Sequence, residues 1–219
     1  MVGILDRQEL CDRLAAGQRE FSDLDLAGAD ISRIDFSDAT LTNCDFDGVN
    51  FTASKLNNAV WTRCRAIKAT FKAADVESGS FSHCNFANTD WSGSRLASAS
   101  FQDCKLTGAD FRESKLLGIT FKNVLLVSAY LRGISFRRMT LEGLDFTQAD
   151  LGGADFRESI LNECRLDGAQ LRAAQFAGSD LRGCDLGKIS LNDAAIFKGA
   201  TISRSQATEL LHGFGLTVI

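Results

Sequence analysis

Every fifth residue of this chain is apolar from Phe21 to Ile196, without a break over 36 consecutive positions. Apart from Ala66, each of these residues is Phe, Leu, Ile, Val or Trp. Strands alternate with a period of about 2 residues and helices with a period of about 3.6, so neither element holds a register of five over this length. The chain is therefore expected to wind into a solenoid in which each of these side chains points to a common axis.

A second inward position lies two residues before each large one and is mostly small. Examples are Ala39, Cys44, Ser54, Ala59, Cys64, Gly79 and Cys84. The remaining three positions of each five are largely Asp, Asn, Ser, Thr, Arg, Lys and Gly. One large inward, one small inward and three outward residues describe a tightly wound square coil. The sequence contains no proline, as expected where nearly every backbone N–H joins a ladder.

Several blocks carry a recurring Ala-Asp-apolar motif: Ala29-Asp30-Ile31, Ala109-Asp110-Phe111, Ala149-Asp150-Leu151 and Ala154-Asp155-Phe156. Over about four-fifths of its length the chain resembles the pentapeptide-repeat family, whose signature is A-(D/N)-L-X-X. The resemblance implies an all-β fold, a right-handed quadrilateral parallel β-helix with four pentapeptides per coil. Cys44, Cys64, Cys84 and Cys104 recur every twenty residues, which independently supports four. The units would make about nine coils, or roughly 43 Å at the usual strand spacing.

A solenoid exposes its core at both ends and needs terminal caps. At the start, Asp6 and Glu9 form a capping box, and Leu5 and Leu10 are placed for a hydrophobic staple. These signals predict a helix over residues 6–17 that covers the first coil.

At the far end, Ser203 and Gln206 form a second capping box, which predicts a helix to about His212. The chain is thus expected to contain a capping helix (1–19), a β-helix (20–198) and a C-terminal helix and strand (199–219). The last part carries a surplus of apolar side chains: Leu210, Leu211, Phe214, Leu216, Val218 and Ile219. They either bury themselves in the cap or form a homodimer through a free strand edge. The tail resembles that of the quinolone-resistance and topoisomerase-protecting pentapeptide proteins, which implies a head-to-head homodimer.

The sequence shows no enzyme signature. Six of the seven cysteines fall at small inward positions without a CxxC motif, which favours structural thiols over a zinc site. His83 and His212 are far apart in the repeat, and the carboxylates lie on a convex surface without a pocket. We expect no catalytic, cofactor or metal site. With no run of about 18 apolar residues and with acids in the first ten, we expect no membrane span and a cytoplasmic location.

Residues 117–139 depart from the repeat. The small inward position there holds Ile119, Val124, Ile134 and Met139. Outward positions hold Leu117, Leu125, Val127 and Tyr130, flanked by Arg132, Arg137 and Arg138. Apolar and basic residues on a polar exterior can mark a contact site for a protein partner. Local variation tolerated by the coil is the alternative interpretation.

The resemblance also implies a function, because the best-known members of the family mimic duplex DNA and protect DNA gyrase or topoisomerase IV. An outward column with Asp30, Asp90, Asp110 and Asp150 would serve such mimicry. Residues 20–50 carry a net charge of −7, but residues 51–75 carry +4 and residues 76–140 carry +3. A duplex about 43 Å long has roughly 25 negative charges, so the charge distribution speaks against a strong mimic.

Two functions therefore remain open. The first is a dimeric, gyrase-binding DNA mimic without direct nucleic-acid contact that protects against quinolones or toxins. The second is a scaffold or adaptor for another protein, such as a secretion-associated or regulatory one.

Overall fold

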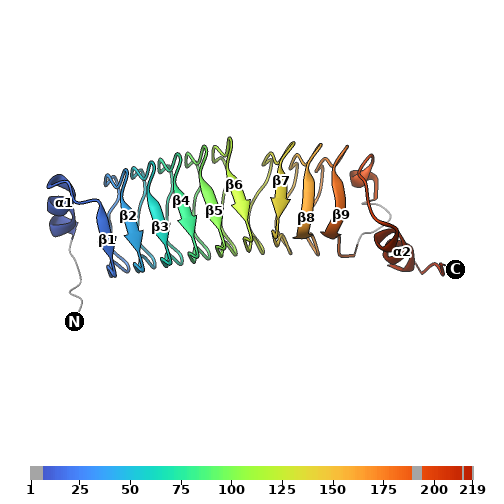
Figure 1. Cartoon of the computed structure of the whole chain (residues 1–219), viewed down its shortest axis with the longest axis horizontal. Helices are drawn as coiled ribbons and strands as arrows, with labels where there is room; N and C mark the ends of the chain where they lie inside the picture. Colours follow the sequence, from blue (N-terminus) through green and yellow to red (C-terminus); the bar gives the residue numbers. More distant parts are fainter. Residues whose placement is uncertain (1–6, 189–193, 214, 219) are drawn as a thin grey trace. The chain divides into compact units, whose positions relative to one another are not determined.

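The structure, a computed structural model, describes residues 7–188, 194–213 and 215–218. The chain forms two compact units, residues 1–124 and 125–219, which are considered separately below. Each contains stacked coils of parallel β-helix and one short α-helix (Figure 1). The expected fold class, a quadrilateral parallel β-helix with helical caps, is confirmed.

The first unit begins with a helix and continues as stacked coils. Its elements are α1 (Arg7–Ala15), β1 (Glu20–Ser22), β2 (Thr40–Thr42), β3 (Val60–Thr62), β4 (Ser80–Ser82), β5 (Ser100–Gln102) and β6 (Thr120–Lys122). Neighbouring strands pair in parallel, with Phe21 beside Leu41 and Leu41 beside Trp61. Partners are twenty residues apart, so each coil contains four pentapeptides, as the cysteine spacing predicted.

The second unit contains β7 (Thr140–Glu142), β8 (Ile160–Arg165), β9 (Asp180–Asp185), a 3-10 helix η1 (Ala194–Phe197) and α2 (Arg204–Gly213). Its register is also twenty between β7 and β8. Between β8 and β9 it shifts locally, since Asn162 pairs with Gly183, and Asp180 pairs with Thr201, twenty-one residues away. Ile196 and Phe197 are both half-buried, but the ring of Phe197 stacks on Phe176 with centroids 4.8 Å apart. The last inward position expected at Ile196 is therefore taken by Phe197.

Each pentapeptide turns a corner with one residue in the left-handed region. The second residue after every large inward one has a positive φ, from Asp23 to Gly178, and 22 of these residues are not glycine. Glycine adopts this conformation freely, while other residues lose about 1 kcal/mol. Parallel ladder bonds on both sides of each coil offset this cost. Asn58, for example, has a φ of 56°, and its backbone N–H donates to the carbonyl of Glu77 in the next coil at 2.9 Å.

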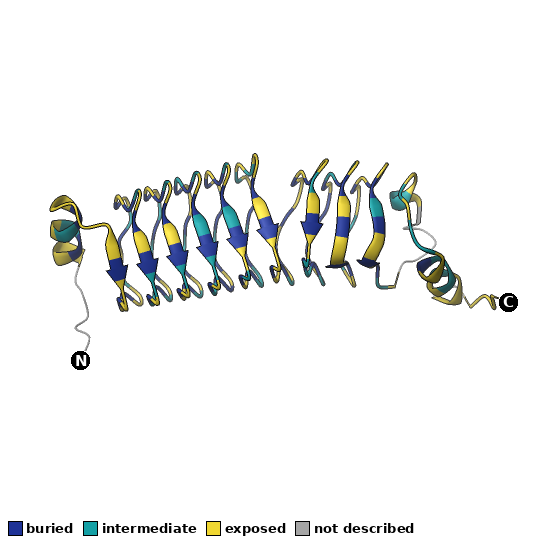
Figure 2. Cartoon of the chain, viewed as in Figure 1, coloured by how far each residue is buried: buried dark blue, intermediate teal, exposed yellow. Residues whose placement is uncertain are grey.

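Aromatic rings stack along the interior from coil to coil. The Phe71 ring lies 4.7 Å from Phe51 and 4.0 Å from Trp91 between centroids, with interplanar angles of 5° and 4°. In Figure 2 the middle residue of each strand from β1 to β7 is buried while its neighbours are more exposed. Six cysteines fill small inward positions, and all seven are free thiols. Burial raises the pKa of the Cys164 thiol to about 11, so this group remains protonated and serves packing.

One tryptophan in the core has an unsatisfied N–H among the described residues, namely Trp61 Nε1. In contrast, Trp91 Nε1 donates to Thr89 Oγ1 at 2.8 Å, two residues earlier. Ala59 stands at the corresponding position before Trp61. We expect Ala59→Ser to supply an acceptor and to raise the free energy of unfolding by about 1 kcal/mol, measured by urea denaturation.

The matched control for this prediction is Ala99→Ser. Ala99 is equally buried and precedes Phe101, whose ring needs no acceptor. If Ala59→Ser stabilises the protein no more than Ala99→Ser does, the hydroxyl does not satisfy Trp61 and the prediction is wrong.

The N-terminal cap is held by apolar and polar contacts. Leu10 and Leu14 of α1 are buried. Arg7 donates to the backbone carbonyls of Asp30 at 2.7 Å and Ser32 at 2.8 Å. The predicted capping helix is thus confirmed over residues 7–15, whereas Leu5 and Asp6 of the staple and capping box lie outside the described residues.

The C-terminal capping box is confirmed. Ser203 N donates to Gln206 Oε1 at 2.6 Å, and Gln206 N donates to Ser203 Oγ at 3.2 Å. The Gln206 amide also donates to the carbonyls of Leu181 and Cys184 at 2.7 and 2.6 Å, which ties α2 to the last coil. The prediction of a strand after this helix is wrong for residues 215–218, which form no strand. Phe214 and Ile219 lie outside the described residues.

Candidate functional site

The predicted acidic column is divided between the two units. In the first unit Asp30, Asn50, Thr70, Asp90 and Asp110 follow one another from coil to coil through parallel bridges. In the second unit, Asp150 lies between Tyr130 and Gln170. Three of the four predicted aspartates therefore share a column, interrupted by neutral residues.

Each aspartate of this column supports the backbone of its own coil. The Oδ1 atoms of Asp30, Asp90 and Asp110 accept the N–H two residues onward at 2.9, 2.8 and 3.0 Å. Asp150 accepts Gly152 N–H in the same way at 3.1 Å. Such Asx turns fix the chain before a corner, and an uncharged asparagine forms them equally well. Asn50 does so with Thr52 N–H at 2.9 Å, which explains why Asp and Asn both fit this position of the repeat.

Hydrogen bonding to the backbone also affects the acidity of these groups. The Ser32 backbone N–H holds the pKa of Asp30 below its usual value. Asp30 is therefore ionised at neutral pH while its Oδ1 is occupied by the turn.

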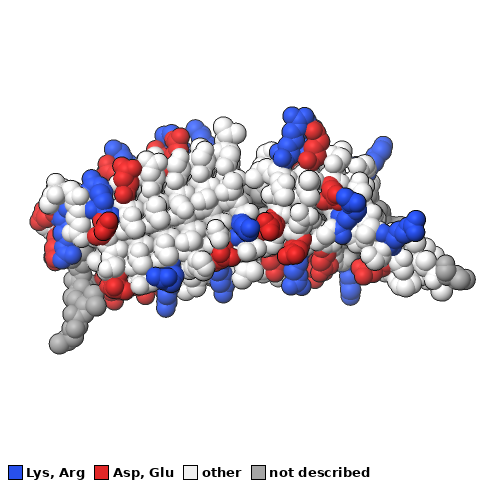
Figure 3. Space-filling view, in the orientation of Figure 1, with Lys and Arg blue, Asp and Glu red and all other residues white. Residues whose placement is uncertain are grey.

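Many other carboxylates are paired with a base of the next coil. Arg95 contacts Asp75 at 3.2 Å and Glu77 at 3.1 Å. Lys55 lies 3.5 Å from Asp35, and Arg65 contacts both Asp45 and Asp47. On the face seen in Figure 3, acidic and basic side chains alternate and form no continuous acidic band. Charge is thus cancelled locally between coils, a pairing that net charges along the sequence do not reveal.

Negative charge without an ion pair is concentrated at the start of the first unit. Within the described residues Glu20, Asp23, Asp25 and Asp38 make no salt bridge, although Asp25 forms an Asx turn with Ala27 and Asp38 accepts the Asn58 amide at 2.9 Å. These coils are the part of the chain most able to attract a basic surface.

Substitutions at Asp90 can separate the two contributions that an aspartate of this column makes to stability, namely its Asx turn and its charge. We expect Asp90→Ala to lower the free energy of unfolding by about 1 kcal/mol, because Ser92 N–H loses its acceptor. Asp90→Asn keeps an acceptor and is expected to change stability by less than about 0.5 kcal/mol. Thermal and urea unfolding would measure both. Equal destabilisation by the two changes would show that charge, and not the turn, determines the stability at this position.

The predicted apolar and basic surface is also divided. Leu117, a strongly exposed residue, belongs to the first unit, and the other members belong to the second. There the side chains of Leu125 and Tyr130 are 44% and 46% exposed, and Val127 is half-buried. We call these three residues the apolar patch. The larger inward residues nearby are accommodated: Ile119, Val124 and Ile134 are buried, and Met139 is half-buried.

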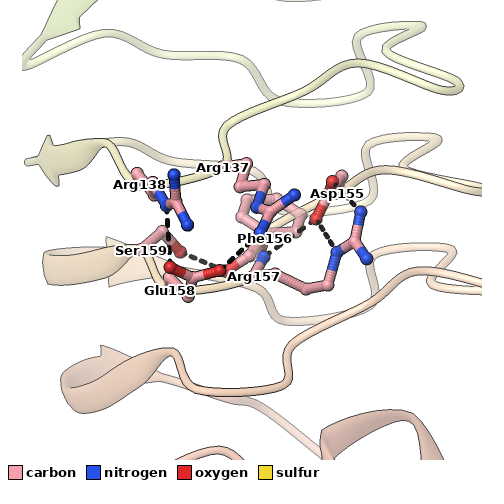
Figure 4. Close-up of polar contacts among 7 residues, drawn as sticks. All are labelled: Arg137, Arg138, Asp155, Phe156, Arg157, Glu158 and Ser159. Carbon is pink, nitrogen blue, oxygen red and sulfur yellow. Dashed lines mark hydrogen bonds and ion pairs between the residues drawn. The ribbon is translucent and has the colours of Figure 1, made fainter.

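Arginines that follow the apolar patch in the sequence form ordered contacts, shown in Figure 4. Arg137 Nη2 and Arg138 Nε donate to the two carboxylate oxygens of Glu158 at 2.6 and 2.7 Å. Arg157 holds Asp155 through Nε at 2.9 Å and Nη2 at 2.7 Å. Arg138, with Arg137, lowers the pKa of Glu158 to about 2. The sequence reasoning missed Asp155, Arg157 and Glu158, although a spacing of about one coil from Arg137 and Arg138 pointed to them.

The histidines form no catalytic arrangement in the structure. His83 is exposed at a corner, with Nε2 3.7 Å from Asp103 Oδ2, and His212 is exposed on α2. Among the described residues no three His, Cys, Asp or Glu side chains are grouped to hold a metal ion. No helix within the described residues is long and apolar enough to cross a bilayer.

Models of the pentapeptide repeat region and of pentapeptide repeats match residues 74–151, 20–58, 44–78 and 149–187. Full-length QnrB1, a plasmid-mediated fluoroquinolone resistance protein, is similar with a TM-score of 0.81 and 22% identity, covering 90% of this chain and 100% of that protein. A trypsin-treated form of QnrB1 gives 0.80 and 22%, covering 91% and 100%.

HetL, which is involved in heterocyst differentiation regulation in the cyanobacterium Nostoc sp., has a TM-score of 0.59 and 23% identity, covering 84% of this chain and 93% of HetL. No curated protein matches the chain by sequence. The coil of four pentapeptides, the stacked inward rings and family matches that run from residue 20 to residue 187 agree: this chain belongs to the pentapeptide-repeat family.

Proposed function

We propose that this protein is a non-enzymatic, cytoplasmic binding protein whose partner is DNA gyrase or topoisomerase IV, which it protects from quinolones or toxins. The observation that carries the proposal is the extent of the match to QnrB1, a fluoroquinolone resistance protein, over that protein's whole length. HetL shares the fold and is involved in heterocyst differentiation regulation, so the fold occurs in proteins with different roles.

The proposed contact is local and electrostatic. Most carboxylates along the coils are occupied by Asx turns or by arginines and lysines. Glu20, Asp23, Asp25 and Asp38 retain their charge without an ion pair among the described residues. These acids would face a basic DNA-binding surface, and the association would weaken as salt screens them.

A supercoiling assay with purified gyrase and ciprofloxacin tests this function. We expect the protein to inhibit supercoiling at high concentration and to relieve ciprofloxacin-induced cleavage at lower concentration. A variant with Asp23→Asn, Asp25→Asn and Asp38→Asn should lose most of this activity. The control, Asp75→Asn, removes a carboxylate that is already paired with Arg95. Absence of inhibition and protection over a broad concentration range would exclude gyrase.

The proposal includes a homodimer through the C-terminal tail. Leu211, Leu216 and Val218 are exposed in the monomer, while Leu210 is half-buried, and removing such apolar surface from water favours association. Light scattering of the purified protein should give twice the monomer mass. Leu211→Asp combined with Leu216→Asp should give the monomer mass, whereas a monomeric wild-type protein would refute the dimer.

A scaffold for another protein is the second candidate, and the apolar patch favours it. Leu125 and Tyr130 lie on a surface where the equivalent residues of the next coil are Asp145 and Asp150. Leu125→Asp and Tyr130→Asp should each abolish binding of a partner that uses the patch, with gyrase protection unchanged. If gyrase protection is lost instead, the patch belongs to the gyrase contact and the scaffold function is wrong.

A further inference from the structure

One face of the second unit is bordered by arginines at both of its corners. Ser135, Asp155 and Gln175 form its outward column through parallel bridges. In chain order, arginines occupy the turns immediately before and after this column. We call the surface the arginine-lined face; its arginines are Arg132, Arg137, Arg138, Arg157 and Arg172.

The arginine-lined face has an excess of positive charge. Its five arginines are accompanied by three carboxylates, those of Asp150, Asp155 and Glu158. Arg172 is exposed and makes no salt bridge within the described residues. Two positive charges are therefore left over, on an otherwise acidic chain with a net charge of −4.

The geometry of this face is suited to carboxylates. Arg157 grips Asp155 with two nitrogens, and Glu158 is clamped between two guanidinium groups. Planar forks of this kind match a carboxylate better than an ammonium group does. Arg132, Arg137 and Arg138 nevertheless have side chains 61%, 40% and 69% exposed. Each guanidinium has five N–H donors, so donors remain available to a second carboxylate from outside.

An exposed aromatic residue, Tyr130, belongs to the column next to this face. Tyr130 is adjacent to Asp150 in the neighbouring column, and Arg132 Nε lies 3.7 Å from Asp150 Oδ2. The Arg132 guanidinium extends over Gly152, where a Cβ would come within 3.1 Å of it. A glycine at this position therefore leaves the space that the Arg132 guanidinium occupies.

We propose that the arginine-lined face binds an acidic peptide segment of a protein partner, with an aromatic side chain of that segment packed against Tyr130. Carboxylates of the segment pair with Arg138, whose side chain is 69% exposed. They also pair with Arg172, which makes no salt bridge within the described residues. A nucleic acid fits the face less well, because its phosphates follow one another without uncharged gaps and meet the three carboxylates of the face. A peptide can space its carboxylates so that they lie only against the arginines. The inference rests on the second candidate function, the scaffold that uses Tyr130, and names the chemistry of that partner.

Fluorescence anisotropy tests the proposal with a labelled peptide of glutamates that carries one central tryptophan. We expect saturable binding that weakens with salt. Arg138→Ala and Arg172→Ala should each raise the dissociation constant by about fivefold, as loss of a partly exposed ion pair does. Replacing the peptide's tryptophan with alanine should weaken its binding to the wild-type protein. The same replacement should have little effect on binding to a Tyr130→Ala variant.

Arg182→Ala is the matched control. Arg182 is equally exposed in the same unit, holds Asp180 through two nitrogens, and lies in β9 on a different face. Its substitution should leave peptide binding unchanged, and thermal unfolding would show that all variants are folded. Equal loss with Arg182→Ala, no binding of the peptide, or tighter binding of an equally labelled DNA duplex would overturn the proposal. The assay contains no gyrase, so its failure and the failure of gyrase protection are separate results.

Discussion

A protein carrying Phe101→Asp is expected not to fold. The Phe101 side chain is 1% exposed, and its ring stacks between Phe81 and Phe121 with centroid distances of 4.7 and 5.6 Å. Removing the ring from a core costs about 3–5 kcal/mol, and burying a carboxylate without a partner costs several more. The sum of these two costs is comparable to the whole free energy of unfolding of a typical domain, roughly 5–15 kcal/mol. Far-UV circular dichroism and the soluble yield would measure the effect.

Ser100→Asp provides the control for this experiment. Ser100 is the neighbour of Phe101 in β5 and points outward, at the position that Asp180 occupies in β9. It should leave the protein folded with a change of less than about 1 kcal/mol. A soluble, β-rich Phe101→Asp protein would contradict the inward assignment of this position and, with it, the repeat of five.

Leu10→Asp is expected to have the second largest effect, because it detaches the N-terminal cap. Leu10 lies on the buried face of α1 and is fully buried, so the change loses about 2–5 kcal/mol of apolar packing. Release of α1 also exposes the first coil, whose strand β1 then presents an open edge. We expect a lower midpoint of thermal unfolding and concentration-dependent aggregation, measured by calorimetry and light scattering.

Gln8→Asp tests whether the effect belongs to the buried face of α1. Gln8 is exposed on the same helix and donates to Asp12 at 2.9 Å. Its replacement should cost only a few tenths of a kcal/mol. A Leu10→Asp protein that remains monomeric and as stable as the Gln8→Asp protein would show that the first coil needs no cap.

Periodicity predicted the interior of this protein well for a physical reason. When each coil contains the same number of residues, the spacing of inward side chains is fixed by the covalent chain, and the sequence displays it directly. Phe46, Trp61 and Phe146 are all fully buried at the positions where the period of five placed them. The helix caps were visible because their hydrogen bonds join residues close in sequence, as with Ser203 and Gln206.

Other features depend on information that the period does not contain. Ile196 and Phe197 are both apolar, so the period alone could not choose between them; the stacking of Phe197 on Phe176 decides the register. The left-handed corners at residues such as Arg33 follow no residue type, because the closed coil imposes them. The pattern of burial therefore did not reveal the backbone conformation.

The candidate site was predicted less well than the core. Summing charge along segments treats residues 20–50 and 51–75 as acidic and basic blocks, whereas Arg65 of the second neutralises Asp45 and Asp47 of the first. The aspartates of the column were recognised as charges, but their role in Asx turns requires the position of the backbone N–H two residues onward. A prediction that paired residues one coil apart would have found the ion pairs, but not the Asx turns.

The parallel register of twenty residues has a consequence for how such a chain changes over generations. In the first unit each coil bonds only to the coil before and the coil after it, as with Trp61 between Leu41 and Phe81. Duplication or deletion of one whole coil therefore preserves the ladder on both sides of the joint. An in-frame copying error of this length alters reach while leaving every remaining side chain in its column, so the length of the binding surface can evolve independently of its composition.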